Sequence, residues 1–535
     1  MNKLYYGDNL TVLKNTIDDE SVDLIYLDPP FNSQATYNVL FRSKSGEQSR
    51  AQIEAFDDTW HWGDEAELAF DGVMKGRNTN AAEMLRSIRA FLKENDMMAY
   101  LSMMAVRLLE LHRVLKSTGS LYLHCDPTAS HYLKILLDAI FGPDKFQNEI
   151  IWQRTISKGL MTRRLPANHD VILSYRRGDQ TTWNPDSIFI PYDLANLDEK
   201  TSGKYSHTDS DGRLYQLDNL INPNPNRPNL TYEFLGVTRV WRWTRERMQA
   251  AYDAGLVIQP SPGSVPRFKR YLDEQRGIPF GDVWGDVPPI NSQAQERLGY
   301  PTQKPQALLE RIVGISSNKG DVVLDPFCGC GTTVHAAQKL KRKWIGIDIT
   351  HLAISLIEKR LKDAFPGIKY EIHGTPKDVD GARALANQDK YQFQWWAVSL
   401  VNAIPFGGRK KGADSAIDGL IYFKPEGKIT EKAIVSVKGG DNVNVSMLRD
   451  LAHVVDRENA KIGVFITLAD STAPMRTEAV KAGYYETIYG KYPKIQILTI
   501  RELFEGKQPN IPLVDSASFK KSARETEGEQ DKLNF

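Results

Sequence analysis

Residues 28–31, Asp-Pro-Pro-Phe, follow the apolar run VDLIYL and combine groups that can carry out chemistry. A carboxylate can accept hydrogen bonds, an aromatic ring can stack, and two prolines hold the main chain rigid. A plain turn would use the same residues, because proline keeps the residue before it out of helical conformation. An active site is the second interpretation, because open α/β sheets bind ligands beyond the carboxyl ends of their strands. The tetrapeptide alone fits both.

A second motif, VVLDPFCGCGTT at residues 322–333, reads as a strand, a glycine-containing turn and the start of a helix. Gly329 and Gly331 would let the main chain approach a ligand closely. Asp348 ends the next strand, WIGID, 23 residues after Asp325, and an acid at that place suits hydrogen bonds to ribose hydroxyls. The alternatives are an arbitrary tight turn and a nicotinamide-binding fold, which the absence of the third glycine of G-x-G-x-x-G disfavours.

The elements that must position these motifs alternate in type along the chain. Strand-like runs and helical stretches follow one another through the first 150 residues, and the rhythm resumes after about residue 300. This pattern predicts a mainly parallel sheet covered by helices. Residues 178 to 300 interrupt it with many Asn, Pro, Asp, Gly and aromatic residues, which indicates an irregular insertion.

The composition is that of an ordinary soluble globular protein of several domains. The 535 residues carry a formal net charge of +1, so any nucleic-acid surface must be a local patch. The N-terminus lacks a signal-peptide pattern, and no apolar run reaches the ~20 residues of a membrane span. The three cysteines predict neither a disulfide nor a zinc site. We therefore expect a protein of the reducing cytoplasm with no membrane partner.

Taken together, DPPF and DPFCGCGTT resemble the catalytic and cofactor motifs of S-adenosylmethionine-dependent amino-methyltransferases acting on DNA. Catalytic motif, insertion and cofactor motif follow in the order of the β group of that family. The segments YYGDNLTVLK, GSLYLHCDPTASHYLKILLDAIFG and GYPTQKPQALLERIV resemble its framework segments, especially those of type III modification subunits. The resemblance covers residues 1 to about 365 and implies a Rossmann-like methyltransferase fold.

The resemblance also implies roles for individual residues. The catalytic motif would be Asp28, Pro29, Pro30 and Phe31, in which Asp28 and the Pro29 carbonyl accept hydrogen bonds from an exocyclic amine and Phe31 stacks on the flipped base. Its first residue, Asp rather than Ser, favours N6 of adenine over N4 of cytosine. The implied S-adenosylmethionine-binding residues are Asp8, Thr302, Gln303, Lys304, Asp325, Phe327, Gly329, Gly331 and Asp348. Among these, Asp8 would lie near the cofactor adenine, and residues 302–304 would close over the methionine end.

DNA contacts are expected from two regions. Six basic residues lie between 154 and 177 against one acid, namely Arg154, Lys158, Arg163, Arg164, Arg176 and Arg177. They predict phosphate contacts, with a solvated charged face as the alternative. The insertion is the expected target-recognition region. A strand through Trp241 and Trp243 would place both rings on one face, where core packing is favoured over base stacking.

The C-terminal stretches GADSAIDGLIYF and AIVSVKGG resemble the Mrr-like branch of the PD-(D/E)xK nucleases, which hold Mg²⁺ between a strand-borne Asp and a carboxylate-x-Lys or Gln-x-Lys motif. Asp418 and Lys438 match by position, and Asp414 matches a secondary acid. Ser436 departs from the pattern, because a hydroxyl is a weaker ligand for Mg²⁺ than a carboxylate. Where a helix often adds a Glu, this chain offers Gln392 or Gln394.

The function we predict is adenine-N6 methylation of double-stranded DNA within a restriction-modification or defence system. The alternatives are a single-chain enzyme that also cleaves DNA with Mg²⁺, an N4-cytosine methyltransferase and a non-enzymatic DNA-binding regulator. A restriction or specificity subunit and a homodimer are the partners considered besides DNA. The predicted domains are the methyltransferase 1–365 with its insertion 178–298, a linker 366–390, a smaller α/β restriction-endonuclease-like domain 391–510 and a polar tail 511–535.

Overall fold

The structure is a computed structural model in which the chain forms two compact units, the second of which is Pro185–Phe280. The residues that it describes are 2–30, 36–42, 48–57, 61–155, 165–291, 294, 296–298, 300, 302–406, 417–423, 425, 430–488 and 490–512. Within these ranges no helix is long and apolar enough to cross a bilayer. Phe31, Lys158, Arg163, Arg164 and Asp414, which the sequence singled out, lie outside the described residues.

The first unit contains a nine-stranded sheet in the order β16-β6-β7-β5-β2-β17-β18-β1-β19. The run from β5 to β19 is parallel throughout, and β7 pairs antiparallel with both β5 and β6. The predicted Rossmann-like, mainly parallel fold is thereby confirmed. The strands are β1 (Lys3–Tyr6), β2 (Val22–Leu27), β5 (Leu115–Cys125), β6 (Phe146–Gln153), β7 (His169–Arg176), β16 (Val283–Trp284), β17 (Val322–Asp325), β18 (Lys343–Asp348) and β19 (Glu371–His373).

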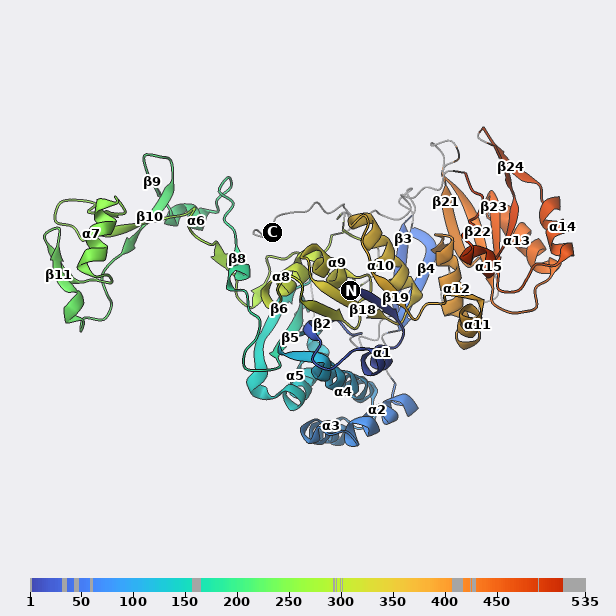
Figure 1. Cartoon of the computed structure of the whole chain (residues 1–535), viewed down its shortest axis with the longest axis horizontal. Helices are drawn as coiled ribbons and strands as arrows, with labels where there is room; N and C mark the ends of the chain where they lie inside the picture. The colour runs from blue at the N-terminus through green and yellow to red at the C-terminus, as the bar shows by residue number, and fades with distance from the viewer. Residues whose placement is uncertain are drawn as a thin grey trace. The chain divides into compact units, whose positions relative to one another are not determined.

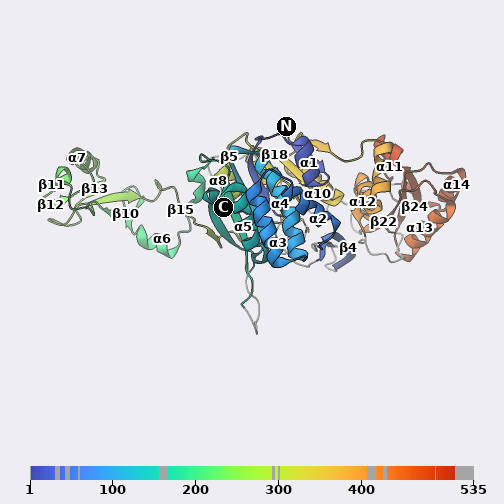
Figure 2. The same ribbon diagram turned by 90° about the horizontal axis from the view of Figure 1, so that it is seen from below.

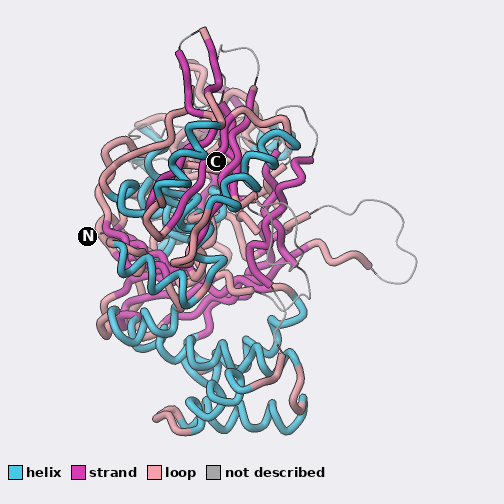
Figure 3. Tube along the Cα trace, turned by 90° about the vertical axis from the view of Figure 1, so that its right-hand side faces the viewer, coloured by secondary structure: helices cyan, strands magenta, loops and turns pink. Residues whose placement is uncertain are grey.

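Helices cover both faces of this sheet, which is why a central strand such as β2 is buried along its whole length. Helices α1, α4 and α5 lie below the sheet in Figure 1 and face the viewer in Figure 2, whereas α8, α9 and α10 lie above it. The helices at the bottom of Figure 3 are α2 and α3, which pack on α4. The bounds are α1 (Asn9–Thr16), α2 (Asp64–Met74), α3 (Thr79–Leu92), α4 (Asp96–Val114), α5 (Pro127–Phe141), α8 (Gln306–Ser316), α9 (Thr332–Lys339) and α10 (His351–Ala364), with a strand pair β3 (Thr36–Arg42) and β4 (Gln48–Asp57) and a 3₁₀ turn η1 (Pro143–Lys145).

The second unit is built on short antiparallel strands around its own core. A four-stranded sheet has the order β13-β14-β10-β9, and β11 pairs with β12. The strand β12 ends at Val240, so no strand of the described residues runs through both Trp241 and Trp243. Trp241 is fully buried and donates from Nε1 to the Tyr232 carbonyl at 2.8 Å, so the preference for core packing is confirmed for this residue. The elements are η2 (Pro185–Ile188), β8 (Phe189–Ile190), α6 (Glu199–Lys204), β9 (His207–Thr208), β10 (Leu214–Asn219), η3 (Pro228–Leu230), β11 (Thr231–Phe234), β12 (Val237–Val240), α7 (Arg245–Asp253), β13 (Val257–Ile258), β14 (Arg267–Tyr271) and β15 (Ile278–Pro279).

The C-terminal part of the first unit has a separate five-stranded sheet in the order β20-β21-β22-β23-β26, antiparallel up to β22 and parallel beyond it. One core lies on the side of α11 and α12 and another on the side of α13 and α14. The smaller α/β fold expected here is confirmed. The elements are α11 (Val379–Gln388), α12 (Lys390–Leu400), β20 (Ile404–Pro405), β21 (Gly419–Phe423), β22 (Glu431–Lys438), α13 (Val445–Arg457), β23 (Ile462–Thr467), α14 (Ala473–Lys481), β24 (Tyr484–Thr487), β25 (Gly490–Pro493), β26 (Ile495–Thr499) and α15 (Ile500–Phe504).

Candidate active site

Asp28 lies immediately beyond the end of β2, where the buried parallel strand gives way to the two prolines. Its Oδ2 accepts a hydrogen bond from Lys304 Nζ at 2.5 Å, and both side chains are largely withdrawn from solvent. Closure of Lys304 over the methionine end of a cofactor stays a prediction, and in the structure its ammonium lies on the carboxylate of the catalytic motif. Pro29 is buried and Pro30 lines the adjoining cavity.

Asp325 and Asp348 end the neighbouring strands β17 and β18, one on each side of the turn that leads into α9. Asp325 Oδ1 accepts from the Phe327 amide at 3.0 Å, and Asp348 Oδ2 accepts from the Gly329 amide at 2.9 Å. Burial raises the pKa of Asp325 to about 7 and that of Asp348 to about 6. Two buried carboxylates therefore lie beside the turn, and a positively charged or hydrogen-bonding ligand would stabilise their ionised forms.

Gly329 and Gly331 of this turn are each required to be glycine, on different structural grounds. Both have left-handed backbone, with φ of +49° at Gly329 and +76° at Gly331. A Cβ at Gly331 would lie 2.7 Å from Ile357 Cγ1, so this residue allows α10 to pack on the start of α9. Gly329 lines the cavity and Gly331 does not.

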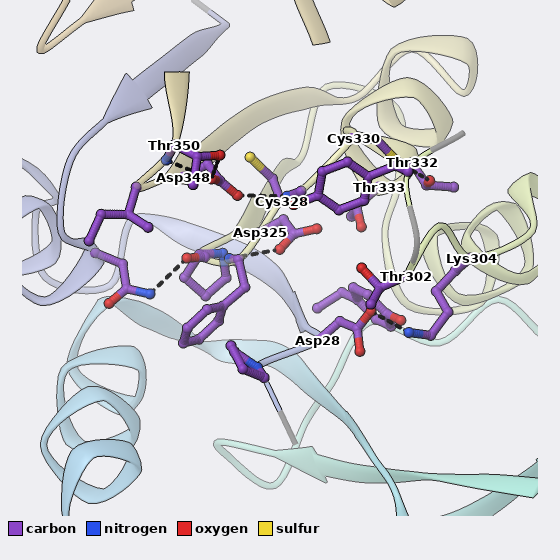
Figure 4. A pocket seen from close by; sticks show the side chains of 18 of the residues that line it. Asp28, Thr302, Lys304, Asp325, Cys328, Cys330, Thr332, Thr333, Asp348 and Thr350 are labelled. Carbon is purple, nitrogen blue, oxygen red and sulfur yellow. Dashed lines mark hydrogen bonds and ion pairs between the residues drawn. The ribbon is translucent and has the colours of Figure 1, made fainter. Parts of the chain in front are cut away.

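A cavity of about 270 Å³ joins these carboxylates. Figure 4 shows Asp28, Thr302 and Lys304 at one end of the site, Asp348 and Thr350 at the other, and Asp325 between them. Among the described residues, the sequence-predicted residues that line it are Asp8, Asp28, Pro30, Thr302, Gln303, Lys304, Asp325, Phe327, Gly329 and Asp348. Cys328 and Cys330 also line it and are free and buried.

Sequence reasoning missed the group that holds Asp8 in place. Arg107, on α4, donates from NH2 to Asp8 Oδ1 at 2.7 Å and from Nε to Asn9 Oδ1 at 2.6 Å. Asn9 in turn donates to the Pro326 carbonyl at 2.8 Å. The start of α1 is thus tied to the turn after β17. An arginine within the apolar face of α4 was the available signal.

The side chain of Gln303 forms its hydrogen bonds within its own loop. It donates from Nε2 to the Glu296 carbonyl at 2.6 Å and accepts from the Leu298 amide at 2.8 Å. It therefore fixes the segment that precedes Lys304, and with it the position of the ammonium on Asp28.

The basic stretch of residues 154–177 is partly neutralised within the protein. Arg154 Nε lies 3.3 Å from Asp170, and Arg177 pairs with Glu20 at 2.9 Å. Arg176 donates to the Asp179 carbonyl at 3.0 Å. Arg154 and Arg177 consequently offer less free charge to a phosphate than the sequence suggested, whereas the carbonyl bond leaves the charge of Arg176 in place.

In the C-terminal sheet, the described carboxylate at the place where the sequence predicted a metal site is that of Asp418. Asp418 precedes β21 and accepts from the Val437 amide and from Gln394 Nε2, both at 2.6 Å, with Ser436 Oγ at 3.5 Å. Burial raises the pKa of Asp418, against the opposing effect of these hydrogen bonds and of the Lys438 charge. Of the two glutamines considered, Gln394 reaches Asp418, whereas Gln392 accepts from the His351 amide.

These side chains do not fit a Mg²⁺ ion. Mg²⁺ is bound by carboxylate and other hard oxygen ligands, and here one carboxylate already accepts protein hydrogen bonds on both of its oxygens. In the part of the chain that the structure describes, no group of three or more His, Cys, Asp or Glu residues could hold a metal ion.

Comparison with known proteins finds one matching family for the large sheet and its cavity and another for the C-terminal sheet. Residues 22–359 match the family model described as DNA methylase, of the N6/N4 type, and residues 385–505 match one described as restriction endonuclease. The type II methyltransferase M.EcaI of Enterobacter cloacae is 30% identical over 369 residues, 67% of this chain and 69% of that protein. The StyLTI Mod subunit, a type III restriction-modification enzyme of Salmonella typhimurium, is 25% identical over 351 residues, 63% of this chain and 50% of the subunit. The DNA adenine methyltransferase YhdJ of Escherichia coli is 48% identical over 81 residues, 15% of this chain and 27% of that protein.

The DNA methylase model alone spans more than half of the 535 residues, and its range contains Asp28, Asp325 and Asp348. The motifs, the sheet and the cavity described above agree with this match. The chain therefore belongs to the N6/N4 DNA methylase family and also carries a restriction-endonuclease segment.

Proposed function

We propose that this chain transfers a methyl group from S-adenosylmethionine to N6 of a flipped-out adenine in double-stranded DNA. The observation that carries the proposal is the position of Asp28, at the end of β2, in one cavity with Asp325 and Asp348. One carboxylate serves the target amine, and the other two serve the cofactor.

The residues of the β17–α9 turn fit S-adenosylmethionine. The bound cofactor supplies an electrophilic methyl group on a positively charged sulfur. Asp348 lines the cavity, where its carboxylate, held by Gly329 and Thr350, presents its charge to the hydroxyls of a bound ribose. Asp325 adds negative charge beside the Gly329 turn, which brings the main chain close to the ligand.

Asp28 makes the exocyclic amine reactive. It accepts a hydrogen bond from the amine, and the Pro29 carbonyl accepts a second, so that the nitrogen lone pair is directed towards the methyl group. The same acceptors stabilise the positive charge that develops on the nitrogen. Lys304 holds the Asp28 carboxylate in place through Oδ2 before the base arrives, and the other oxygen can accept from the incoming amine.

Recognition of DNA is supported by the charge distribution within Pro185–Phe280. Arg213, Lys269 and Arg270 of the four-stranded sheet pair with acids of the same unit. The segment around β11 and β12 differs, because its five exposed arginines make no ion pair with any carboxylate among the described residues. They are Arg227, Arg239, Arg242, Arg245 and Arg247.

We infer that this segment contacts the DNA backbone. Arg239→Ala should lower DNA affinity and reduce the slope of log affinity against log salt by about one, whereas Arg213→Ala should leave the slope unchanged. Equal slopes in both variants would place the DNA elsewhere.

The choice of adenine rests on Asp, not Ser, at position 28 and on the similarity to an adenine methyltransferase. Nucleoside mass spectrometry of unmethylated DNA incubated with the protein and S-adenosylmethionine tests it directly. N6-methyladenine is expected. N4-methylcytosine would keep the mechanism and overturn the base, and no product on varied DNA would overturn the proposal for the chain alone.

The restriction-endonuclease segment favours a second candidate function, DNA cleavage by the same chain. Because its described residues do not fit Mg²⁺, we propose instead that this segment binds DNA, or a restriction or specificity subunit, without cutting. Incubation of unmethylated duplex DNA with the protein and Mg²⁺ tests this. Cleavage that Asp418→Ala abolishes would establish the second function. A homodimer stays a prediction, for which sedimentation with and without DNA is the test.

A further inference from the structure

A buried row of three polar side chains runs across neighbouring strands of the large sheet beside Asp28. Tyr26 Oη on β2 lies 2.9 Å from His124 Nδ1 on β5, and His124 Nε2 lies 3.1 Å from Asp170 Oδ2 on β7. The strands β2, β5 and β7 are consecutive in the sheet. The chemistry proposed above uses none of these three groups.

The row meets the cavity at Tyr26. Tyr26 lies in β2, and the charge of Asp28, directly beyond the end of that strand, acts on it. Tyr26 lines the cavity together with Asp28, whereas the side chains of His124 and Asp170 are 0% and 4% exposed. A proton that reaches the row from the cavity must therefore pass through the Tyr26 hydroxyl.

The partners of each atom fix where the hydrogens lie. Burial works to raise the pKa of Asp170, but the His124 ring and the charges of Lys304 and Arg154 outweigh it and hold the pKa below its usual range. Asp170 is thus an ionised acceptor, and the His124 Nε2–H donates to it. In a neutral ring Nδ1 is then the acceptor, so Tyr26 donates its hydroxyl hydrogen to Nδ1. The remaining lone pairs of the Tyr26 oxygen are left for a donor in the cavity.

We propose that this row takes up the proton that the target amine loses after methyl transfer, an inference that rests on the proposed function. The N–H bond of the methylated, positively charged amine breaks and its electron pair stays on nitrogen. The proton goes to the Tyr26 oxygen while the Tyr26 hydroxyl proton passes to His124 Nδ1. The imidazolium so formed lies between Tyr26 and the negative charge of Asp170.

The charged groups around the row act on the imidazolium that the proton transfer would form. Asp170, from β7, favours the imidazolium, and Arg154, 3.3 Å from Asp170, opposes it. Lys304 acts on Asp170, and Asp28 acts on Tyr26.

Tyr26→Phe tests the proposal, because it removes the hydroxyl and keeps the ring. We expect kcat for methylation to fall about tenfold or more, with the Kd of S-adenosylmethionine and the KM of DNA changed less than twofold. Asp170→Asn should lower kcat similarly, and the double variant should lose little more, since both substitutions break the same row.

Tyr122→Phe is the matched control. Tyr122 is the register partner of Tyr26 on β5, is equally buried, and bonds Ser316 Oγ at 2.6 Å outside the row. Its loss should cost comparable thermal stability and leave kcat unchanged. Wild-type kcat in Tyr26→Phe, or additive losses in the double variant, would overturn the proposal. Absence of methylation by the wild-type protein would instead overturn the proposed function, which separates the two failures.

Discussion

Two strand-end carboxylates, Asp28 in the large sheet and Asp418 in the C-terminal sheet, have the same local setting and different surroundings. Asp28 follows the buried strand β2, and Asp418 precedes the strand β21. Each carboxylate accepts short hydrogen bonds. Asp28 opens into a cavity of about 270 Å³ that two further carboxylates line. Asp418 is held by a main-chain amide and a glutamine, and in the described part of the chain no second carboxylate joins it in a metal-binding group.

The difference shows that a motif becomes a reaction centre through what surrounds it. The partner of Asp28 is a lysine ammonium on Oδ2, and Asp28 also lines the cavity, so its carboxylate can be reached by a ligand there. The partners of Asp418 belong to the fold, since the Val437 amide lies on β22 and Gln394 on α12. Its hydrogen bonds stabilise the junction of α12, β21 and β22.

The largest difference in methylation activity is expected when each of the two carboxylates, in turn, is replaced by alanine. Asp28→Ala should reduce methylation at least about a hundredfold, because the developing charge on the amine loses its acceptor. Binding of S-adenosylmethionine, measured by calorimetry, should change little. Asp418→Ala should leave methylation unchanged, and Asp18→Ala, an exposed site in the same domain, controls for general damage. Methylation that survives Asp28→Ala would remove the contrast.

The second effect concerns the cofactor end of the cavity. Asp348→Asn keeps the shape and removes the charge that anchors the Gly329 amide and that we propose binds the ribose. Hydrogen bonds to charged groups contribute about 1.5–3 kcal/mol, so the Kd of S-adenosylmethionine should rise roughly 10- to 150-fold. Calorimetric titration measures this. An unchanged Kd would mean that Asp348 serves the turn alone.

A smaller effect follows from the raised pKa values of Asp325 and Asp348, about 7 and about 6. Both lie above the ordinary value of ~3.9, so the neutral carboxyls favour the unliganded fold at low pH, and this stabilisation is lost as pH rises through 6 to 7. A positively charged cofactor favours the ionised forms and must displace protons below these values. Affinity for S-adenosylmethionine should therefore increase from pH 5.5 to about 7.5 and then level off. Asp325→Asn should flatten part of this rise, and a curve of undiminished steepness in that variant would contradict the assignment.

The sequence predicts features that depend on neighbouring residues better than features that depend on how distant segments pack. Asp28, Asp325 and Asp348 could be found because each ends a recognisable strand, and parallel strands bring their carboxyl ends to one edge. The row from Tyr26 to Asp170 could not, because it depends on β5 and β7 lying in that order beside β2. The choice between Gln392 and Gln394 likewise depended on which face of α12 packs towards β21. The interruption of the α/β rhythm indicated the insertion, but the end of β12 at Val240 depends on how Trp241 packs into its core.

The smallest effect, and the one that addresses the comparison most directly, is expected from giving the C-terminal site the carboxylate that it lacks. Ser436 is 2% exposed and faces Asp418, so Ser436→Asp should lower the thermal midpoint in the absence of metal through like-charge repulsion. Mg²⁺ should then restore stability in the variant and not in the wild type. A concentration five times the Kd corresponds to about 1 kcal/mol. Ser446→Asp, at an exposed position of α13, is the control. If Mg²⁺ shifted the wild type and Ser436→Asp equally, the absence of a second carboxylate would not be what distinguishes Asp418 from Asp28.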